Sequence, residues 1–184
     1  MAPAPPLMTT DDYFREPETL RPAELAYGVM HVADAPSPRH QSAVADLFRA
    51  LDRHVNERDL GRMWLAPLDV VLDAEQSLIV QPDLLFVSSA REVIVQDRVR
   101  GAPDLVIEVL SPNPRVGRTV EHIAWFAAYG VRECWWVETI RRDVTVMTFD
   151  DHRVSGRRTY AATDPIRSRV LPDWSMTLNE VLRP

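Results

Sequence analysis

The chain is predicted to be a single-domain mixed α/β protein, in which a central mixed β-sheet is flanked by helices. Apolar runs rich in β-branched residues, typical of strands, alternate with amphipathic segments typical of helices. One such run, residues 105–110, is followed by a helical segment and a second apolar run, which is the order of a βαβ unit. No internal repeat or linker divides the chain.

Helices are predicted where capping residues precede a helical period. Thr9 and Thr10, followed by two aspartates, predict a short helix that ends before Pro17. Pro38 begins a long helix with an apolar stripe, and a second amphipathic helix follows the two prolines after residue 110 and ends at Gly130. A last short helix is predicted over residues 178–182. Residues 1–8, rich in alanine and proline, are predicted to be a disordered tail before a domain of residues 9–184.

Strands are predicted from apolar runs between turn residues. Pro82 lies inside one of them and implies an edge strand, a bulge or two short strands. Residues 93–99 favour a short strand or a turn. The run over residues 133–138 is expected to lie parallel to residues 105–110, and the next two strands to form a hairpin. The predicted strands cover residues 24–32 with a turn near Gly28, 63–66, 68–72, 77–87, 105–110, 133–138, 143–149 and 157–161.

Composition narrows the class of protein. No apolar run is long enough to span a membrane, and the N-terminus lacks the pattern of a signal peptide. The one cysteine, Cys134, cannot form an internal disulfide, so a cytoplasmic location is expected. The formal net charge of −6 argues against a uniformly basic nucleic-acid-binding surface, but not against a local basic cleft. All 21 basic residues are arginine, so no step can use a lysine side chain.

Two acidic residues in apolar runs are the first candidates for chemistry. Glu108 lies inside a predicted buried strand, and Asp83 lies in another. A buried carboxylate is costly unless it is paired, protonated or bound to a metal. Two such acids could hold Mg²⁺, which takes oxygen ligands and can activate water at a phosphoryl group. The alternative is that each acid caps a turn or pairs with an arginine.

Several segments in a fixed order resemble a large bacterial family. They are AELAYGVMHV, SPRHQ, LIVQPDLLFV, GAPDLVIEVLSP, AAYGVRECWWVE and LPDWSMTLNEVL. The chain resembles the Uma-type family of restriction-endonuclease-like proteins over nearly its whole length. The fold of that family belongs to the PD-(D/E)XK nuclease superfamily, which implies a restriction-endonuclease-like fold here.

The resemblance implies a metal-dependent site. Asp83, Glu108 and the backbone carbonyl of Val109 would bind Mg²⁺ or Mn²⁺, and Glu24 would support the metal-bound water. His40 matches a position that the family often fills with histidine; it could face the cleft or cap the helix.

The chain departs from this pattern at the residue that such nucleases use to position water. The usual lysine is replaced by His122, and an aspartate one turn earlier is replaced by Arg118. Both lie on one helical face. Arg118 cannot act as a base but can contact a phosphate. His122 can orient water, relay a proton or bind a metal, or it can be a histidine of the helix surface.

Two functions follow from these observations. The first is a metal-dependent endonuclease that hydrolyses DNA phosphodiester bonds. By analogy with related nucleases, in which one active site per chain cuts one strand, a homodimer is expected. The second is a catalytically degenerate member of the fold that binds DNA or a protein partner.

Overall fold

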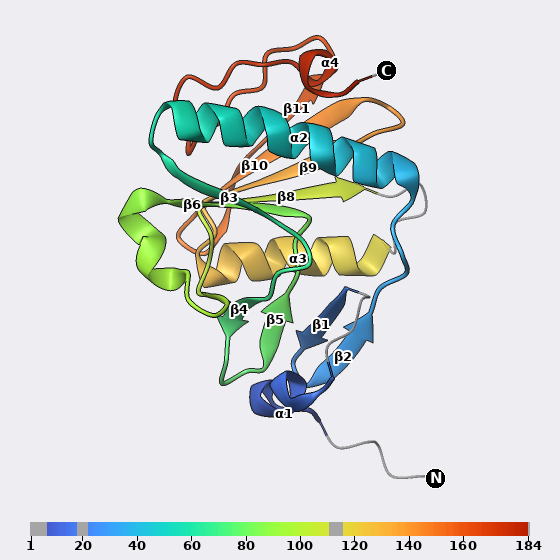
Figure 1. Ribbon diagram of the computed structural model, residues 1–184, viewed down its shortest axis with the longest axis vertical. Coiled ribbons are helices and arrows are strands. Elements are labelled where there is room, and N and C mark those ends of the chain that lie inside the picture. Colours follow the sequence, from blue (N-terminus) through green and yellow to red (C-terminus); the bar gives the residue numbers. More distant parts are fainter. Residues whose placement is uncertain (1–6, 18–21, 111–115, 184) are drawn as a thin grey trace.

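Two β-sheets and two long helices make up most of the structure, a computed structural model that describes residues 7–17, 22–110 and 116–183 (Figure 1). Side chains are described within the last of these ranges from residue 120 onward. In chain order the elements are α1 Thr10–Arg15, β1 Ala23–Ala26, β2 Val29–Val32, α2 Pro38–Glu57, β3 Gly61–Leu65, β4 Val70–Asp73, β5 Leu78–Val80, β6 Leu84–Ser88, the 3₁₀ helix η1 Ser89–Ile94, β7 Val99–Arg100, β8 Leu105–Leu110, α3 Val116–Tyr129, β9 Glu133–Glu138, β10 Asp143–Asp150, β11 Arg153–Ala161 and α4 Leu178–Val181.

The strands form a five-stranded sheet in the order β2-β1-β5-β4-β7 and a six-stranded sheet in the order β11-β10-β9-β8-β6-β3. The predicted mixed α/β class is confirmed, although the strands divide between two sheets instead of forming one. Pro82 explains part of the division, because it has no N–H to continue a ladder. The apolar run over residues 77–87 therefore splits into β5 and β6, which lie in different sheets.

The predicted βαβ unit lies at the centre of the six-stranded sheet. β8 pairs in parallel with β9, with Glu108 opposite Trp136, and antiparallel with β6. The connecting helix α3 ends before Gly130, whose φ of 94° is a conformation that glycine adopts without strain. The hairpin of β10 and β11 is also present and begins four residues earlier, at Arg153, than the sequence suggested.

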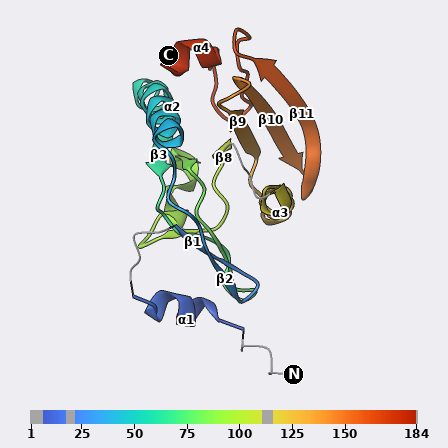
Figure 2. The same ribbon diagram turned by 90° about the vertical axis from the view of Figure 1, so that its right-hand side faces the viewer.

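The two long helices cover opposite faces of this sheet (Figure 2). Leu105, Ile107 and Val109 of β8 pack in the cluster that contains the apolar stripe of α2. Val106 packs in the second cluster, with α3 and residues of the five-stranded sheet. Successive side chains of a strand point to opposite faces, so Glu108 lies on the α3 side.

Two fully buried acidic side chains, Glu133 and Asp104, connect neighbouring segments to the six-stranded sheet through hydrogen bonds. Glu133 accepts hydrogen bonds from Trp135 Nε1 at 2.7 Å, Ser168 Oγ at 2.6 Å and the Arg169 N–H at 2.7 Å. These contacts hold the segment after β11 against β9.

The second of these acids is Asp104. It accepts from the Ser88 N–H at 2.9 Å and pairs with Arg91 at 3.4 Å and with Arg132 at 3.2 Å. It thereby holds η1 and the start of β9 in place.

The remaining predictions have mixed outcomes. In the region predicted as a short strand or a turn, residues 93–99, the last two residues of η1 are followed by a turn closed by an antiparallel bridge between Val95 and Val99, where β7 begins. The tail over residues 1–8 stays a prediction, because residues 1–6 lie outside the described residues; the Met8 N–H donates to the Gly28 carbonyl at 2.8 Å. Among the described helices, none is both long and apolar enough to cross a membrane.

Candidate active site

Three predicted residues meet where β1, β8 and α3 come together. His122 of α3 lies between two carboxylates, with Nε2 3.1 Å from Glu24 Oε2 and Nδ1 3.4 Å from Glu108 Oε1. All three side chains are only 14–15% exposed. The imidazole therefore bridges two half-buried acids that are far apart in sequence.

A second group lies at the adjacent strand of the sheet. Asp83 directly precedes β6, and its Oδ2 accepts a hydrogen bond from the Val109 N–H at 2.8 Å. His40, in the first turn of α2, places Nε2 3.2 Å from the same oxygen. Leu84 pairs with Ile107 across β6 and β8, so Asp83 lies level with Glu108.

The two histidines are stabilised as cations by their acid partners. Burial lowers the pKa of His122, but the hydrogen bonds and charges of Glu108 and Glu24 outweigh it and raise the pKa to about 10. The hydrogen bond to Asp83 raises the pKa of His40 above its ordinary value, and burial opposes this shift. At neutral pH the structure therefore holds an imidazolium between Glu24 and Glu108.

Glu108 shows the opposite tendency. Burial raises its pKa to about 7, with Asp83 and Glu24 adding to the shift and His122 opposing it. Several acids in a dry site repel one another, and a cation among them relieves that repulsion. His122 is the cation that does so here.

The donor set suits a hard divalent cation. Asp83, Glu108 and the Val109 carbonyl supply the oxygen ligands that Mg²⁺ prefers. Within the described part of the chain, no group of three or more His, Cys, Asp or Glu side chains is arranged as a metal site. The pair Asp83 and Glu108, completed by a backbone carbonyl, fits the predicted ligand set, with Glu108 currently bonded to His122.

The other candidate residues have different surroundings. His40, for which a cleft position and a helix-capping role were both open, points its ring at Asp83. The ring of Trp125 lies 5.2 Å from that of His122 and forms a wall of the site. The Arg118 side chain lies outside the described residues. The roles predicted for Glu24, Asp83, Glu108, Val109 and His122 stay predictions.

Three arginines near this site in sequence, all in the described part of the chain, pair with acids. Arg91 pairs with the buried Asp104. Arg98 pairs with Asp69 and Asp97, and Arg100 also pairs with Asp97. None of these three therefore offers an unpaired cation to a phosphate.

Sequence reasoning missed the residues that hold Glu24. The Gln81 N–H donates to Glu24 Oε1 at 3.1 Å. The Gln81 side chain accepts from the Ala23 N–H at 3.1 Å and donates to Asp69 Oδ1 at 2.8 Å. Tyr13 OH donates to the Ala23 carbonyl at 2.9 Å and lies 3.1 Å from Asp69 Oδ1. The only sequence signal was the position of Gln81 two residues before Asp83 in an otherwise apolar run.

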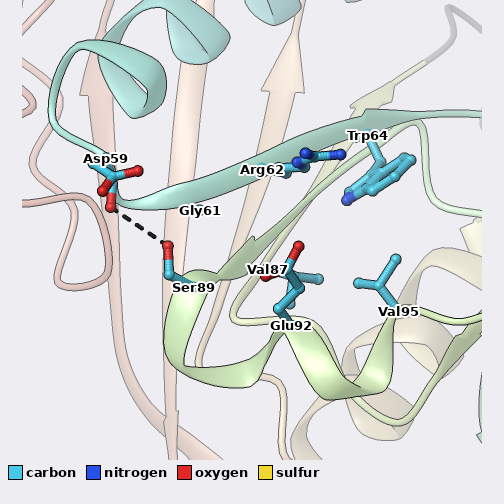
Figure 3. A pocket seen from close by; sticks show the side chains of 8 residues that line it. All are labelled: Asp59, Gly61, Arg62, Trp64, Val87, Ser89, Glu92 and Val95. Carbon is cyan, nitrogen blue, oxygen red and sulfur yellow. Dashed lines mark hydrogen bonds between the residues drawn. The ribbon is translucent and has the colours of Figure 1, made fainter.

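A pocket of about 180 Å³ lies elsewhere, between β3 and η1 (Figure 3). It is lined by Asp59, Gly61, Arg62, Trp64, Val87, Ser89, Glu92 and Val95. None of the predicted site residues lines it, and its lining residues include no histidine. The candidate site is therefore the cluster around His122 and not this pocket.

Comparison with known proteins identifies a family and a similar fold. A family model described as "Uma2: Putative restriction endonuclease" matches residues 10–179. The fold is similar to that of a putative nuclease belonging to DUF820 from Anabaena variabilis ATCC 29413, with a TM-score of 0.79 and 16% sequence identity. The alignment covers 95% of this chain and 97% of that one. No curated protein matches the sequence significantly.

Proposed function

Since the chain belongs to the Uma2 family of putative restriction endonucleases, we propose that it is a metal-dependent endonuclease that hydrolyses DNA phosphodiester bonds. Family membership supports a nuclease-like function. The observation that carries the finer proposal is the convergence of Glu24, Glu108 and His122, with Asp83 on the neighbouring strand.

In this proposal, Asp83, Glu108 and the Val109 carbonyl bind Mg²⁺ or Mn²⁺. A bound divalent cation would polarise a phosphoryl oxygen and lower the pKa of the attacking water. Glu24, held by the Gln81 N–H, orients that water. Arg118 would contact the substrate phosphate.

His122 takes the position of the lysine that related nucleases use. As an imidazolium it donates hydrogen bonds and does not accept a proton. In this state it suits stabilisation of negative charge at phosphorus, and not removal of a proton from water. Its place between Glu24 and Glu108 keeps that positive charge at the predicted reaction centre.

The test combines metal binding with cleavage. We expect calorimetry to detect Mg²⁺ or Mn²⁺ binding by the wild type, in the presence of DNA if substrate completes the site, and to lose it in Asp83→Asn. Plasmid cleavage should disappear in Asp83→Asn and Glu108→Gln. Asp151→Asn is the control, because it removes one carboxylate at an exposed turn. Equal cleavage by wild type and Asp83→Asn would trace the activity to a contaminant and contradict the proposal.

A second candidate is a degenerate member of the fold that binds DNA or a protein partner without cutting. The absence of lysine favours it, as does the occupation of Glu24 and Glu108 by His122. Metal-dependent cleavage that vanishes in Glu108→Gln would exclude this candidate.

We further propose a cytoplasmic homodimer. Two copies of a single-strand-cutting site would cut both strands of a duplex, and homo-oligomers of this kind are most often two-fold symmetric. Sedimentation equilibrium measures the oligomeric state directly, and a monomer at all protein concentrations would contradict this part of the proposal.

A further inference from the structure

Positive charge is concentrated in β11 and the segment that follows it. Residues 153–169 contain five arginines and one aspartate, a formal charge of +4 in a chain whose net charge is −6. β11 is the end strand of the six-stranded sheet, so one of its edges carries no neighbouring strand of that sheet. This part of the molecule differs in electrostatic character from the rest of the chain.

A cavity of about 330 Å³ opens here, where residues 167–169 pass beside β9, β10 and β11. Figure 2 shows the segment after β11 returning past these strands toward α4. The cavity is lined by Glu133, Val146, Thr148, Gly156, Arg157, Arg158, Tyr160, Arg167, Ser168 and Arg169.

Glu133, the only acid of this cavity, does not neutralise the arginines. Its side chain is fully buried, and its oxygens accept three hydrogen bonds from the protein. Burial raises the pKa of its carboxyl above the ordinary value. The arginines at the mouth therefore face solvent and not an acid of the floor.

The four arginines that line the cavity differ in their contacts, and the guanidinium carbon of Arg157 lies 5.6 Å from the centre of the Trp136 ring. Arg169 is held by Asp150 through contacts of 2.8 and 3.0 Å. Arg158 and Arg167, both exposed, have no carboxylate within ion-pair distance among the described residues. The guanidinium carbon of Arg158 lies 4.9 Å from the centre of the Tyr160 ring, which limits the freedom of this side chain.

We propose that this cavity is a second nucleic-acid contact, in which Arg158 and Arg167 bind a backbone phosphate away from the candidate active site. Guanidinium groups form paired hydrogen bonds with phosphate oxygens, and such contacts position a nucleic acid without reading its sequence. The inference rests on the proposed nuclease function for the identity of the molecule that carries the phosphate.

The register of the sheet relates this cavity to the site. Arg158 pairs with Val146, Val146 with Trp135 and Trp135 with Ile107, the residue before Glu108. Three strand spacings of about 4.8 Å separate Arg158 from Ile107, or about 14 Å across the sheet. Arg158 faces the α2 side of the sheet and Glu108 the α3 side, so the bound strand would pass around the β11 edge.

Binding without cleavage tests this inference. The full chain is titrated, in the presence of EDTA, into a short fluorescein-labelled DNA duplex, and anisotropy is recorded over a range of salt concentrations. The variant is Arg158→Gln/Arg167→Gln. The control is Arg53→Gln/Arg62→Gln, which removes the same charge from exposed arginines on α2 and β3. We expect the variant, and not the control, to lose affinity by roughly tenfold per arginine. The slope of log K against log salt should become shallower by about 1 per arginine.

A second arm distinguishes a nucleic acid from a free phosphate compound. Inorganic phosphate is titrated while the side-chain Nε–Hε signals of the arginines are followed by NMR. Shifts at Arg158 and Arg167 together with loss of duplex affinity support the inference. Phosphate shifts without loss of duplex affinity overturn the assignment to nucleic acid, and equal behaviour of the two double variants in both arms overturns the site.

These results are independent of catalysis, because no divalent metal is present. A chain that binds duplex through Arg158 and Arg167 but never cuts would contradict only the proposed endonuclease activity. A chain whose cleavage and binding are unchanged in Arg158→Gln/Arg167→Gln would contradict only this inference.

Discussion

Replacing His122 by alanine should destabilise the protein in a way that depends on pH and on divalent metal. In the wild type this imidazolium lies 3.1 Å from Glu24 and 3.4 Å from Glu108. His122→Ala leaves two half-buried carboxylates facing each other beside Asp83. His122→Lys is the matched control, because it retains a positive charge at this position.

The magnitude follows from the burial of the three groups. Breaking a buried ion pair by removing one partner typically costs about 3 to 5 kcal/mol. The remaining exposure of 14–15% allows partial hydration, so we expect a loss near the lower end, about 3 kcal/mol at pH 8. With a urea dependence of about 2 to 3 kcal/mol per molar, the unfolding midpoint should fall by about 1 M.

The dependence on pH has a definite sign. The pKa of His122 is raised to about 10, so its stabilising contribution is fully present below the unfolded value near 6.5 and is lost as the pH rises through 10. In His122→Ala the pKa of Glu108, already raised to about 7, loses the imidazolium that held it down and rises further. The variant should therefore recover stability as the pH falls from 8 to 6, because protonation of Glu108 removes one of the unpaired charges.

Urea unfolding followed by tryptophan fluorescence, at pH 8 and pH 6, measures these differences. Addition of Mg²⁺ at pH 8 should stabilise His122→Ala more than the wild type, because a metal then replaces the missing cation. A variant as stable as the wild type at pH 8, or one whose own stability does not rise between pH 8 and pH 6, would refute the assigned electrostatics.

Three further outcomes are expected. Glu133→Leu removes the acceptor of three hydrogen bonds, one buried and two partly buried, at about 1 to 3 kcal/mol each. It should lower the melting temperature far more than Glu92→Leu at the exposed η1, and similar melting temperatures would contradict this. Burial lowers the pKa of His54, so the neutral imidazole stabilises the fold above pH 6.5, and this contribution is lost as the pH falls through the pKa of the folded state. Between pH 7 and pH 5, His54→Gln should therefore lose less stability than the wild type, which denaturant titrations at the two pH values measure. Glu24→Gln removes one of the two carboxylates that raise the pKa of His122 and should bring that pKa down toward its ordinary value, which an NMR titration of the imidazole would detect and an unchanged pKa would exclude.

Local chemistry explains which parts of the fold could be predicted. The start of α2 was readable because Ser37 accepts from the His40 N–H and Pro38 takes the first helical position. The parallel pairing of β8 and β9 follows from the order of a βαβ unit. The division into two sheets was not readable, because pairings such as β1 with β5 join residues more than fifty positions apart and depend on packing.

The site residues that could be predicted from the sequence pattern were the charged residues within apolar segments. Glu108 was conspicuous because a charged residue interrupts a buried strand, and Asp83 because it follows Pro82 in an apolar run. Glu24 and His122 came from resemblance alone, since their contact spans 98 positions. Gln81 gave only a weak signal, its position in an otherwise apolar run, because a neutral amide between two strands carries no charge that marks it as part of a site.

The alternation along β8 bears on how such a family can evolve. Leu105, Ile107 and Val109 build the α2 core, whereas Glu108 between them faces α3. Residues of the core and of the site are therefore neighbours in the chain but occupy different sides of the sheet. Selection can exchange polar groups on the α3 side while the α2 core keeps the chain folded. A relative without catalytic activity would retain the same fold, so a shared fold by itself cannot distinguish active members of the family from inactive ones.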